Sequence, residues 1–456
     1  IGYESRFDQY DILIDKTMSL VPRKHRYVID ERTDVNGSII TSIDKDQFYN
    51  LITKIKHENF ESIAVGFLHS YANPDNEKIL KAFLTNELPD VEVSISSDVC
   101  PEIREYERFT TTVVNAYIKP LMSNYLKKLD QKLLNSGFNC PLLLMTSGGT
   151  LTNISSACNN PVRLVESGPA GGAILATSIA EDMNLNKVIS FDMGGTTAKI
   201  TIIENKKAIK AREFEVDRKA RFKKGSGYPL RIPVIEMVEI GAGGGSIARV
   251  NKLDQIITGP DSAGSFPGPA CYSNGGSMPT ITDADLVIGK INPDNFAGGK
   301  IKLSKQLADK AITQNIVKFV NIDTNIAALA ISEIVDETMS NAARVHTVEQ
   351  GHETSNRTLI AFGGAAPLHI ARVEEKLRVS NVIIPTNASV GSAVGFLKAP
   401  VGYEVVKSLR MLLNRFETDK VNDLLEKMKN EAQSIIQSET GSIKFVEERF
   451  AFMRNA

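Results

Sequence analysis

The first third of the chain alternates short apolar runs with polar turns and amphipathic stretches. Ser62–Leu68 (SIAVGFL) is a short apolar run and predicts a buried strand. The polar segment Asn73–Asn76 predicts a turn, and the apolar spacing over Glu77–Asn86 predicts a helix after it. A further short apolar run, Leu142–Met145, predicts a second fully buried strand. This region therefore mixes strands and helices.

Between those two strands the apolar residues recur at helical spacing and predict a long helix over Glu105–Leu134. The residues that carry the pattern are Val113, Tyr117, Leu121, Leu126, Leu129 and Leu133. Gly137 is suited to end the helix. Pro120 lacks a backbone N–H, so we expect it to kink the helix or to divide it in two.

From residue 145 onward, short apolar strands run repeatedly into glycine-rich turns. These turns are MTSGGT (145–150), ESGPAGG (166–172), FDMGGTTAK (191–199), IGAGGGS (240–246) and FGGAAP (362–367). Alternating strands and helices with glycine turns at the strand ends favour an α/β architecture that binds ligands at the carboxyl ends of its strands. No repeat in residue identity accompanies the pattern.

The pattern changes after about residue 405. Asn414–Ser438 reads as a polar amphipathic helix and suggests the start of another domain. Phe445–Phe452 alternates like an unfinished strand, and the chain opens at Ile1 instead of a methionine. We therefore expect a fragment of a longer protein, incomplete at both ends.

Composition excludes several classes of function. The 456 residues suggest two or three domains, and 53 basic residues balance 54 acidic ones, so nothing indicates a nucleic-acid or anionic-membrane partner. Apolar runs fall short of the roughly 20 residues of a membrane span, and no signal segment opens the chain. The cysteines Cys100, Cys140, Cys158 and Cys271 form no C-x-x-C pair and are interpreted as incidental thiols of a cytoplasmic protein.

The segment with the clearest chemistry is VISFDMGGTTAKITII (188–203). Val188–Phe191 predicts a strand, Asp192 stands at its end, and the chain resumes as a strand over Lys199–Ile203 and another around Lys207–Phe214. Asp192 is a candidate to hold hydrated Mg²⁺ or to orient water beside a polyphosphate. The alternative is an ordinary hairpin turn. The candidate phosphate-binding residues are Gly194, Gly195, Thr196 and Thr197.

Two further segments support the phosphate interpretation. Glu166 precedes a helix of small residues that runs to about Ala180, and its carboxylate could face the same Mg²⁺ or the attacking nucleophile. Downstream, the strand Leu359–Phe362 leads into a helix that ends near Leu377, with Pro367 suited to its first turn. Gly363, Gly364 and Ala365, between that strand and helix, are the candidates to receive an adenine–ribose unit.

Several residues keep competing interpretations. Gly243, Gly244 and Gly245 indicate close backbone approach, either to a ligand, which we favour, or to another part of the protein. Asp283 and Asp285 could approach an active site, but capping of the following helix is favoured. His369 is interpreted as a packed, hydrogen-bonded histidine, and Arg218–Lys224 as a solvated basic face.

The order of acidic residue and helix, phosphate hairpin and distant Gly-Gly helix resembles the second half of actin-like ATPases. More narrowly, the chain resembles the ATP-binding, hydantoinase A-type members of the hydantoinase/oxoprolinase family, from residue 10 to about 405. The strings that carry this resemblance are residues 10–39, EIREYERFTTTVVNAYI (102–118), SGPAGG (167–172), FDMGGTTAK (191–199), EIGAGGGSIARV (239–250), GPDSAGSFPGPACY (259–272), TDADLVIGKINPDNFAGG (282–299) and FGGAAPLH (362–369).

The resemblance implies an α/β protein with an actin-like ATPase fold, whose two lobes close on Mg-ATP, and a C-terminal appendage. It implies the remainder of an N-terminal domain over 1–95, an ATPase domain over 96–405 and the start of a C-terminal domain over 406–456. The family's first phosphate hairpin is absent from these residues, and its place is expected before Ile1.

The implied activity is ATP-dependent hydrolysis of a cyclic amide, such as a hydantoin or 5-oxoproline, by phosphorylation of the substrate oxygen. A hydantoinase B-type subunit is the implied partner, giving a hetero-oligomer. Three alternatives remain: one component of an ATP-dependent ketone carboxylase, a sugar-type kinase, and a chaperone-type ATPase switch without metabolic substrate.

Overall fold

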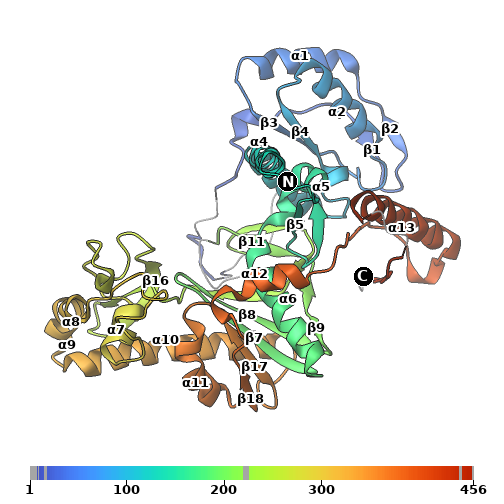
Figure 1. The fold of residues 1–456 in the computed structure, drawn as a ribbon. Helices are drawn as coiled ribbons and strands as arrows, with labels where there is room; N and C mark the ends of the chain where they lie inside the picture. Colours follow the sequence, from blue (N-terminus) through green and yellow to red (C-terminus); the bar gives the residue numbers. More distant parts are fainter. Residues whose placement is uncertain (1–7, 9, 15–17, 219–224, 441–443, 454–456) are drawn as a thin grey trace. The chain divides into compact units, whose positions relative to one another are not determined.

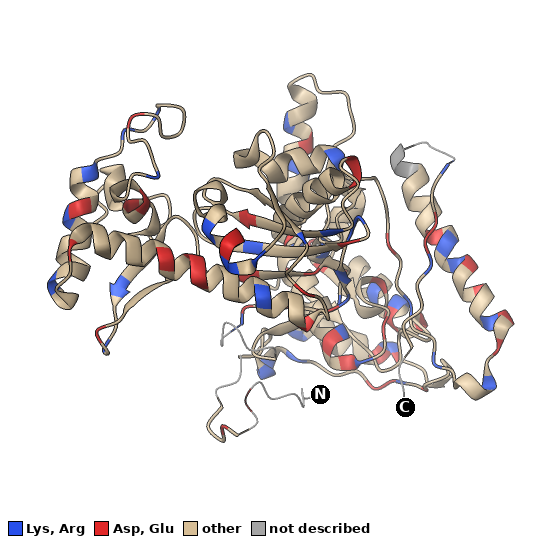
Figure 2. Cartoon of the chain, turned by 90° about the horizontal axis from the view of Figure 1, so that it is seen from below, with Lys and Arg blue, Asp and Glu red and all other residues tan. Residues whose placement is uncertain are grey.

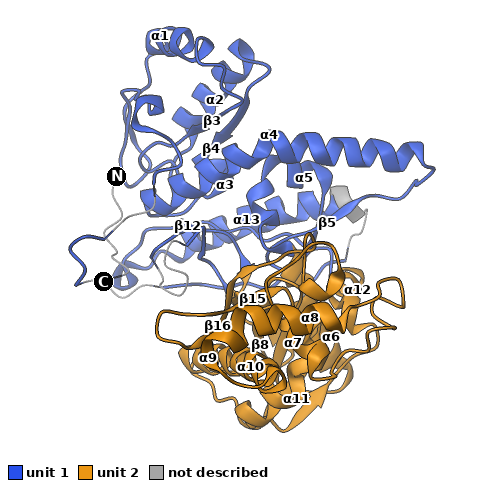
Figure 3. Ribbon diagram, turned by 90° about the vertical axis from the view of Figure 1, so that its left-hand side faces the viewer, with its two compact units in different colours: residues 1–167, 211–234, 400–456 blue, residues 168–210, 235–399 orange. Residues whose placement is uncertain are grey.

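A computed structural model describes residues 8, 10–14, 18–218, 225–440 and 444–453 of the chain. The chain divides into two compact units (Figure 3). Unit 1 comprises residues 1–167, 211–234 and 400–456, and unit 2 comprises residues 168–210 and 235–399. Each unit is therefore assembled from separate stretches of sequence.

The first part of unit 1 contains two helices and a parallel pair of strands, which follow the short antiparallel pair β1 (Arg32–Thr33) and β2 (Ile39–Thr41) (Figure 1). The helices are α1 (Lys45–Lys56) and α2 (Asp75–Glu87), and the strands are β3 (Ser62–Val65) and β4 (Glu92–Ile95). Their shared core includes Phe48, Ile52, Leu80, Leu84 and Ile95. The strand predicted over Ser62–Leu68 stops at Val65, because the N–H of Phe67 donates to the Glu77 carboxylate at 2.8 Å.

The long helix α4 (Glu105–Asn135) confirms the helical pattern of its apolar residues. It continues through Pro120, so of the two expected outcomes the division into two helices does not occur, and the kink stays a prediction. Buried residues on both sides of the proline, Ala116 and Leu126 among them, keep the helix on the core despite the missing N–H. Gly137, at φ +89°, ends the helix as predicted, and the N–H of the next residue, Phe138, donates to the carbonyl of Leu133.

The rest of unit 1 consists of short elements. The expected strand at 142–145 is β5 (Leu143–Met145), which pairs with β6 (Leu151–Asn153), and α5 (Ile154–Asn159) follows. The helix predicted from Asn414 begins later, as α13 (Thr418–Thr440). The prediction of a strand over Phe445–Phe452 is wrong. Residues 444–453 form no strand, since exposed side chains such as Val446 have no neighbouring strand to pack beside.

Unit 2 is built around a mixed sheet with the strand order β14-β8-β7-β17-β18. The strands are β7 (Lys187–Met193), β8 (Ala198–Glu204), β14 (Met237–Ile240), β17 (Thr358–Phe362) and β18 (Asn381–Ile383). β7, β8 and β14 form an antiparallel meander, while β17 and β18 run parallel to β7. The long second strand expected around Lys207–Phe214 is broken into pieces, of which β9 (Lys207–Ala208) extends the sheet beside β8.

Helices and a two-stranded ribbon complete unit 2. The helices are α6 (Ser167–Asp182), α7 (Ile281–Val287), α8 (Lys305–Ile312), α10 (Thr324–Glu349), α11 (Ala366–Leu377) and α12 (Gly391–Lys398). Of these helices, α10 and α11 contact the strands of the sheet. The ribbon pairs β15 (Ser246–Val250) with β16 (Ile256–Ser262). The mixed α/β class expected from the sequence is confirmed.

Helices α6 and α12 meet through glycines. A Cβ added to Gly395 would stand 1.7 Å from the carbonyl oxygen of Gly171, and one added to Gly171 would stand 2.3 Å from the ring of Phe396. Side chains at either glycine would hold the two backbones apart. The crossing therefore fixes where α12, and the loop before it, lie against α6.

Charged residues of both signs are interspersed along the helices (Figure 2). Within the described residues, no helix combines the length and the hydropathy that a bilayer crossing requires.

Candidate functional site

Asp192 lies near the carboxyl end of β7, in the middle of the sheet. It stands opposite Lys199 of β8, and its Oδ2 accepts a hydrogen bond from the hydroxyl of Ser392 at 3.2 Å. Burial raises the pKa of the Asp192 carboxyl, while the Ser392 hydrogen bond and the charge of Lys199 act in the opposite direction. Desolvation dominates, so this carboxylate would be stabilised by a cation placed beside it.

Glycines on two neighbouring elements leave room for that carboxylate. A Cβ added to Gly172 of α6 would come within 3.2 Å of Asp192 Oδ2. A Cβ added to Gly363, just beyond β17, would stand 2.6 Å from Asp192 Oδ1 and 2.4 Å from the carbonyl oxygen of Met193. Gly363 also has φ +93°, which side chains rarely adopt. Only glycine fits at position 363.

The hairpin that follows Asp192 presents bare backbone. The N–H of Gly194 donates to the carbonyl of Thr197 at 3.1 Å and closes the turn, and Gly195 and Thr196 are exposed. A Cβ added to Gly194 or Gly195 would meet no described atom within 4 Å, and neither residue has a left-handed φ. Packing and backbone conformation thus do not require glycine here, whereas close approach of a ligand would.

Two other glycines of unit 2 share these properties. Gly168 lies in the first turn of α6, and Gly364 precedes α11; both are exposed. At either position an added Cβ would have no neighbour within 4 Å in the part of the chain that the structure describes, and neither φ is left-handed. The bare backbone of unit 2 therefore coincides with three segments singled out in the sequence: the small-residue helix, the hairpin and the Gly-Gly turn.

The close approach indicated by Gly243, Gly244 and Gly245 is made to the hairpin itself. A Cβ added to Gly243 would stand 2.5 Å from the backbone nitrogen of Thr196. The N–H of Gly244 donates to Gly194 and that of Gly245 to Gly195, at 3.1 and 2.7 Å. This loop therefore supports the hairpin at Gly194–Thr197, and direct ligand contact by these glycines stays a prediction.

The Gly-Gly turn is anchored on the same strand as Asp192. The N–H of Ala365 donates to the carbonyl of Met193 at 3.0 Å, and α11 begins at Ala366 with Pro367 in its first turn. Because its N–H is engaged in this way, Ala365 is better placed to fix the turn than to donate to a ligand. The exposed backbone here belongs to Gly364.

His369, one turn into α11, is fully buried between two carboxylates. Its Nδ1 hydrogen-bonds Asp336 Oδ1 of α10 at 2.7 Å, and its Nε2 lies 3.1 Å from Asp285 Oδ2 of α7. Burial opposes protonation, yet the hydrogen bonds and charges of Asp285 and Asp336 raise the pKa of His369 to about 9. The packed, hydrogen-bonded histidine expected from the sequence is confirmed.

The two aspartates of α7 differ in role. Asp283 caps the helix as predicted: it exchanges hydrogen bonds with Thr280 in a capping box and also accepts from the N–H groups of Ala270 and Cys271. The capping interpretation of Asp285 is wrong, because its carboxylate turns to His369 instead.

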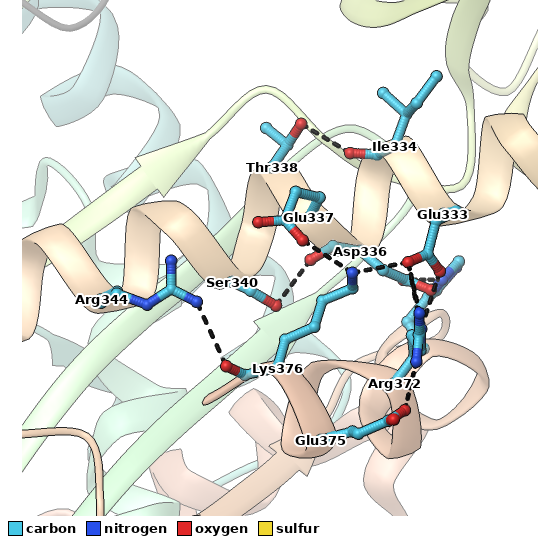
Figure 4. A network of polar contacts seen from close by, with 11 residues as sticks. Glu333, Ile334, Asp336, Glu337, Thr338, Ser340, Arg344, Arg372, Glu375 and Lys376 are labelled. Carbon is cyan, nitrogen blue, oxygen red and sulfur yellow. Dashed lines mark hydrogen bonds and ion pairs between the residues drawn. The ribbon is translucent and has the colours of Figure 1, made fainter. Parts of the chain in front are cut away.

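Farther along α11, an exposed network of ion pairs fastens this helix to α10 (Figure 4). Lys376 Nζ lies 2.6 Å from Glu333 and 2.7 Å from Glu337, and Arg372 pairs with Glu333 at 2.7 Å and with Glu375 of its own helix. The helix after the Gly-Gly turn is thereby held to α10 through both buried and exposed charges.

Glu166 occupies the turn ahead of α6 with φ +62°, an uncommon conformation for a residue with a side chain. Ser147 braces this turn by donating to the carbonyls of Val165 and Arg163 at 2.5 and 2.7 Å. Glu166 belongs to unit 1 and Asp192 to unit 2, so a shared role at one metal ion stays a prediction.

Sequence reasoning missed Ser392 and left open what Gly243–245 approach. Nothing in the local pattern around Ser392 marks a partner 200 positions earlier in the chain. Of the basic stretch Arg218–Lys224, Arg218 pairs with Glu215 at 3.1 Å, and 219–224 lie outside the described residues.

The donor set at Asp192 suits magnesium. No three His, Cys, Asp or Glu side chains of the described chain gather into a metal cage. Mg²⁺ usually binds through one or two carboxylates together with substrate phosphates and water. Asp192, its Ser392 hydroxyl and the open hairpin beside it match that mode of binding.

Known proteins with similar sequences and structures include enzymes named for ATP-dependent reactions. The alpha subunit of caprolactamase from Pseudomonas jessenii is 31% identical over 96% of this chain and 62% of its own length. The gamma subunit of acetophenone carboxylase from Aromatoleum aromaticum is 30% identical over 89% of the chain and 55% of its own length. The crystal structure of ATP-dependent caprolactamase from Pseudomonas jessenii matches with a TM-score of 0.81 and 30% identity, over 98% of this chain and 64% of that one.

The chain thus spans less than two thirds of the length of these relatives. Two family models match it: hydantoinase/oxoprolinase N-terminal region over residues 1–88 and hydantoinase/oxoprolinase over residues 108–405. The chain belongs to the hydantoinase/oxoprolinase family.

Proposed function

We propose that this chain is the nucleotide-binding part of an ATP-dependent enzyme that hydrolyses a cyclic amide by phosphorylating its carbonyl oxygen. The observation that carries the proposal is the desolvated Asp192 carboxylate beside a hairpin of bare glycine backbone. A relative with 31% identity is named for a lactam, which is a cyclic amide. A mixed sheet with an acidic strand end and a Gly-Gly helix supports an actin-like ATPase fold.

In this proposal each part of the site has a distinct task. Asp192 holds Mg²⁺, which neutralises phosphate charge and the charge that develops during phosphoryl transfer. The backbone of Gly194 and Gly195 and the hydroxyls of Thr196 and Thr197 hold the phosphates, and Gly364 leaves a flat surface for adenosine. Glu166 orders the water around the metal. A hydantoinase B-type subunit completes a hetero-oligomer, and the N-terminal, ATPase and C-terminal regions divide near 95 and 405.

A neutral amide is a poor electrophile, and phosphorylation of its oxygen makes the carbonyl carbon reactive toward water. The carbonyl oxygen attacks the γ-phosphorus of ATP, the bond to the bridging oxygen breaks, and ADP leaves. Water then adds to the activated carbon, and the ring nitrogen leaves with a proton, which gives an acyl phosphate. A second water releases phosphate and the open-chain amino acid. Alignment and charge neutralisation supply most of the rate in such transfers.

The test is phosphate release from Mg-ATP by the full-length protein co-expressed with its partner subunit, in the presence of 5-oxoproline, hydantoins or caprolactam. Stimulation by a lactam or hydantoin, and its loss in Asp192→Asn, is expected. Asp182→Asn, an exposed carboxylate at the end of α6, is the matched control. Full turnover by the Asp192→Asn protein would refute the assigned role.

A ketone carboxylase is the second candidate, because the gamma subunit of acetophenone carboxylase matches over 89% of the chain. That reaction would phosphorylate an enolate and bicarbonate instead of a lactam. Phosphate release that requires both a ketone and bicarbonate would favour it over the hydrolase.

A further inference from the structure

Helix α7 contacts the glycine loop that supports the hairpin through one residue, and helix α11 through another residue one turn later. At its start, the N–H and the hydroxyl of Thr282 both donate to the carbonyl of Gly244 at 2.8 Å. The N–H of Gly244 in turn donates to the carbonyl of Gly194 in the hairpin. Three residues after Thr282, Asp285 lies 3.1 Å from His369. A short chain of contacts therefore joins the hairpin to the helix behind the Gly-Gly turn.

Of the two ends of this chain of contacts, the one at His369 carries the larger free-energy cost of burial. His369 and Asp285 are 0% and 1% exposed, and buried charges are costly unless they are paired. Asp285 also accepts from Ser332 at 3.2 Å and lies 3.6 Å from Lys290 Nζ, while Asp336 occupies the other nitrogen of His369. Sliding α11 along α7 would break the pair and leave each of these two buried side chains with one partner fewer.

We propose that the His369–Asp285 pair fixes the spacing between the phosphate hairpin and the adenosine-side helix, so that both contact one nucleotide at once. Both residues are positioning residues, since neither reaches the open surface. This inference rests on the proposed function, in which the two elements bind opposite ends of ATP.

If the pair fixes the spacing of two subsites, its loss changes binding affinities in a way that a general loss of fold stability does not. When two subsites stand at the right distance, a ligand that spans them gains affinity over its separate halves, because the second contact becomes intramolecular. If the spacing relaxes, the spanning ligand loses that advantage, whereas each half still finds its own subsite. Adenosine and Mg-pyrophosphate are the halves, and Mg-ADP is the spanning probe.

The experiment measures the binding of Mg-ADP, adenosine and Mg-pyrophosphate by calorimetry to the full-length protein and to His369→Gln and Asp285→Asn. Each variant is expected to bind Mg-ADP about tenfold more weakly, with the Kd of each half changed by less than about twofold. Asp285→Asn keeps the shape of the side chain and the His369–Asp336 hydrogen bond. The binding of the three probes to it therefore tests the proposal even where His369→Gln fails to fold.

Asp336→Asn is the matched control. It removes the second carboxylate that contacts the His369 imidazole, but Asp336 lies on α10, whereas the contact with Gly244 comes from α7. It is expected to bind Mg-ADP within about threefold of the wild-type protein. Unchanged Mg-ADP binding in Asp285→Asn, or equal loss for all three probes, would overturn the spacing role alone. Failure of the wild-type protein to bind Mg-ADP would instead remove the proposed function, and the inference with it.

Discussion

Ser392 donates a hydrogen bond to Asp192 at 3.2 Å across 200 positions of sequence. The contact joins the first turn of α12 to the end of the central strand β7, and it is held in place where α12 meets α6 through Gly395 and Gly171. The hydroxyl lowers the pKa of a carboxyl that burial raises. Ser392 therefore helps to keep Asp192 ionised and oriented for a cation.

Ser392→Ala tests this relationship. Loss of the hydrogen bond should raise the pKa of Asp192 further and weaken Mg-ADP binding about tenfold or more, since hydrogen bonds to charged groups contribute about 1.5–3 kcal/mol and about 1.4 kcal/mol corresponds to tenfold. Calorimetric titration of Mg-ADP into the variant measures it. Ser389→Ala, an exposed serine just before α12, is the control and should bind as the wild-type protein does. Equal affinity in both variants would contradict the role.

Neighbouring glycines should respond differently to the same change. Gly363→Ala places a methyl group against Met193 and Asp192 at φ +93°, and should lower the free energy of unfolding by at least about 1–3 kcal/mol. The added methyl group of Gly364→Ala meets no atom of the described residues within 4 Å, so stability should stay nearly unchanged while Mg-ADP binding weakens. Thermal melts with and without Mg-ADP separate the two effects. A stable Gly364→Ala protein with normal affinity would argue against a ligand at this turn.

Asp192→Asn should stabilise the protein in the absence of nucleotide while abolishing turnover. Because burial raises the pKa of Asp192 in the folded state, its charged form costs stability once the pH rises above the ordinary value of 3.8. Asparagine keeps the shape without the charge. The melting temperature at pH 7 is therefore expected to exceed that of the wild-type protein, and the difference should vanish below pH 3.8. A lower melting temperature at pH 7 would count against a desolvated carboxylate.

His369 should make stability fall in mildly alkaline solution. Its pKa is raised from 6.5 to about 9 in the folded state, where it faces Asp285 and Asp336, with Lys290 beyond Asp285. The folded protein thus holds a proton that the unfolded chain releases. The stabilisation, on the order of 3 kcal/mol, is complete below pH 6.5 and is lost as pH rises through 9. Urea titrations at several pH values should show this slope in the wild-type protein and not in His369→Gln.

The parts of the site that follow from local sequence were predictable. The strand before Asp192, the tight hairpin at Gly194–Thr197 and the helix opened by Pro367 are each encoded by adjacent residues, and the structure contains all three elements. Backbone conformation at these places depends on the missing Cβ of glycine and on apolar periodicity, which can be read within about ten positions.

Contacts between distant segments were not predictable in the same way. The partner of Ser392 and the turn of Asp285 toward His369 depend on how whole helices pack. A hydroxyl or carboxylate can form its hydrogen bonds either with the backbone at a nearby helix end or with a distant side chain. Sequence spacing does not indicate which of these two partners it has. Pro120 illustrates the converse, since tertiary burial keeps α4 continuous where local chemistry predicts a break.

The division of the chain into interleaved stretches bears on its synthesis. The last stretch of unit 2 ends at residue 399, whereas unit 1 still awaits 400–456. Leu151 pairs with this late stretch, donating to Pro400 and accepting from Gly402. At about 5–20 residues per second, a ribosome exposes the first 150 residues for at least about ten seconds before those partners emerge. Unit 2 is therefore free to fold first, while unit 1 waits for the backbone partners of Leu151.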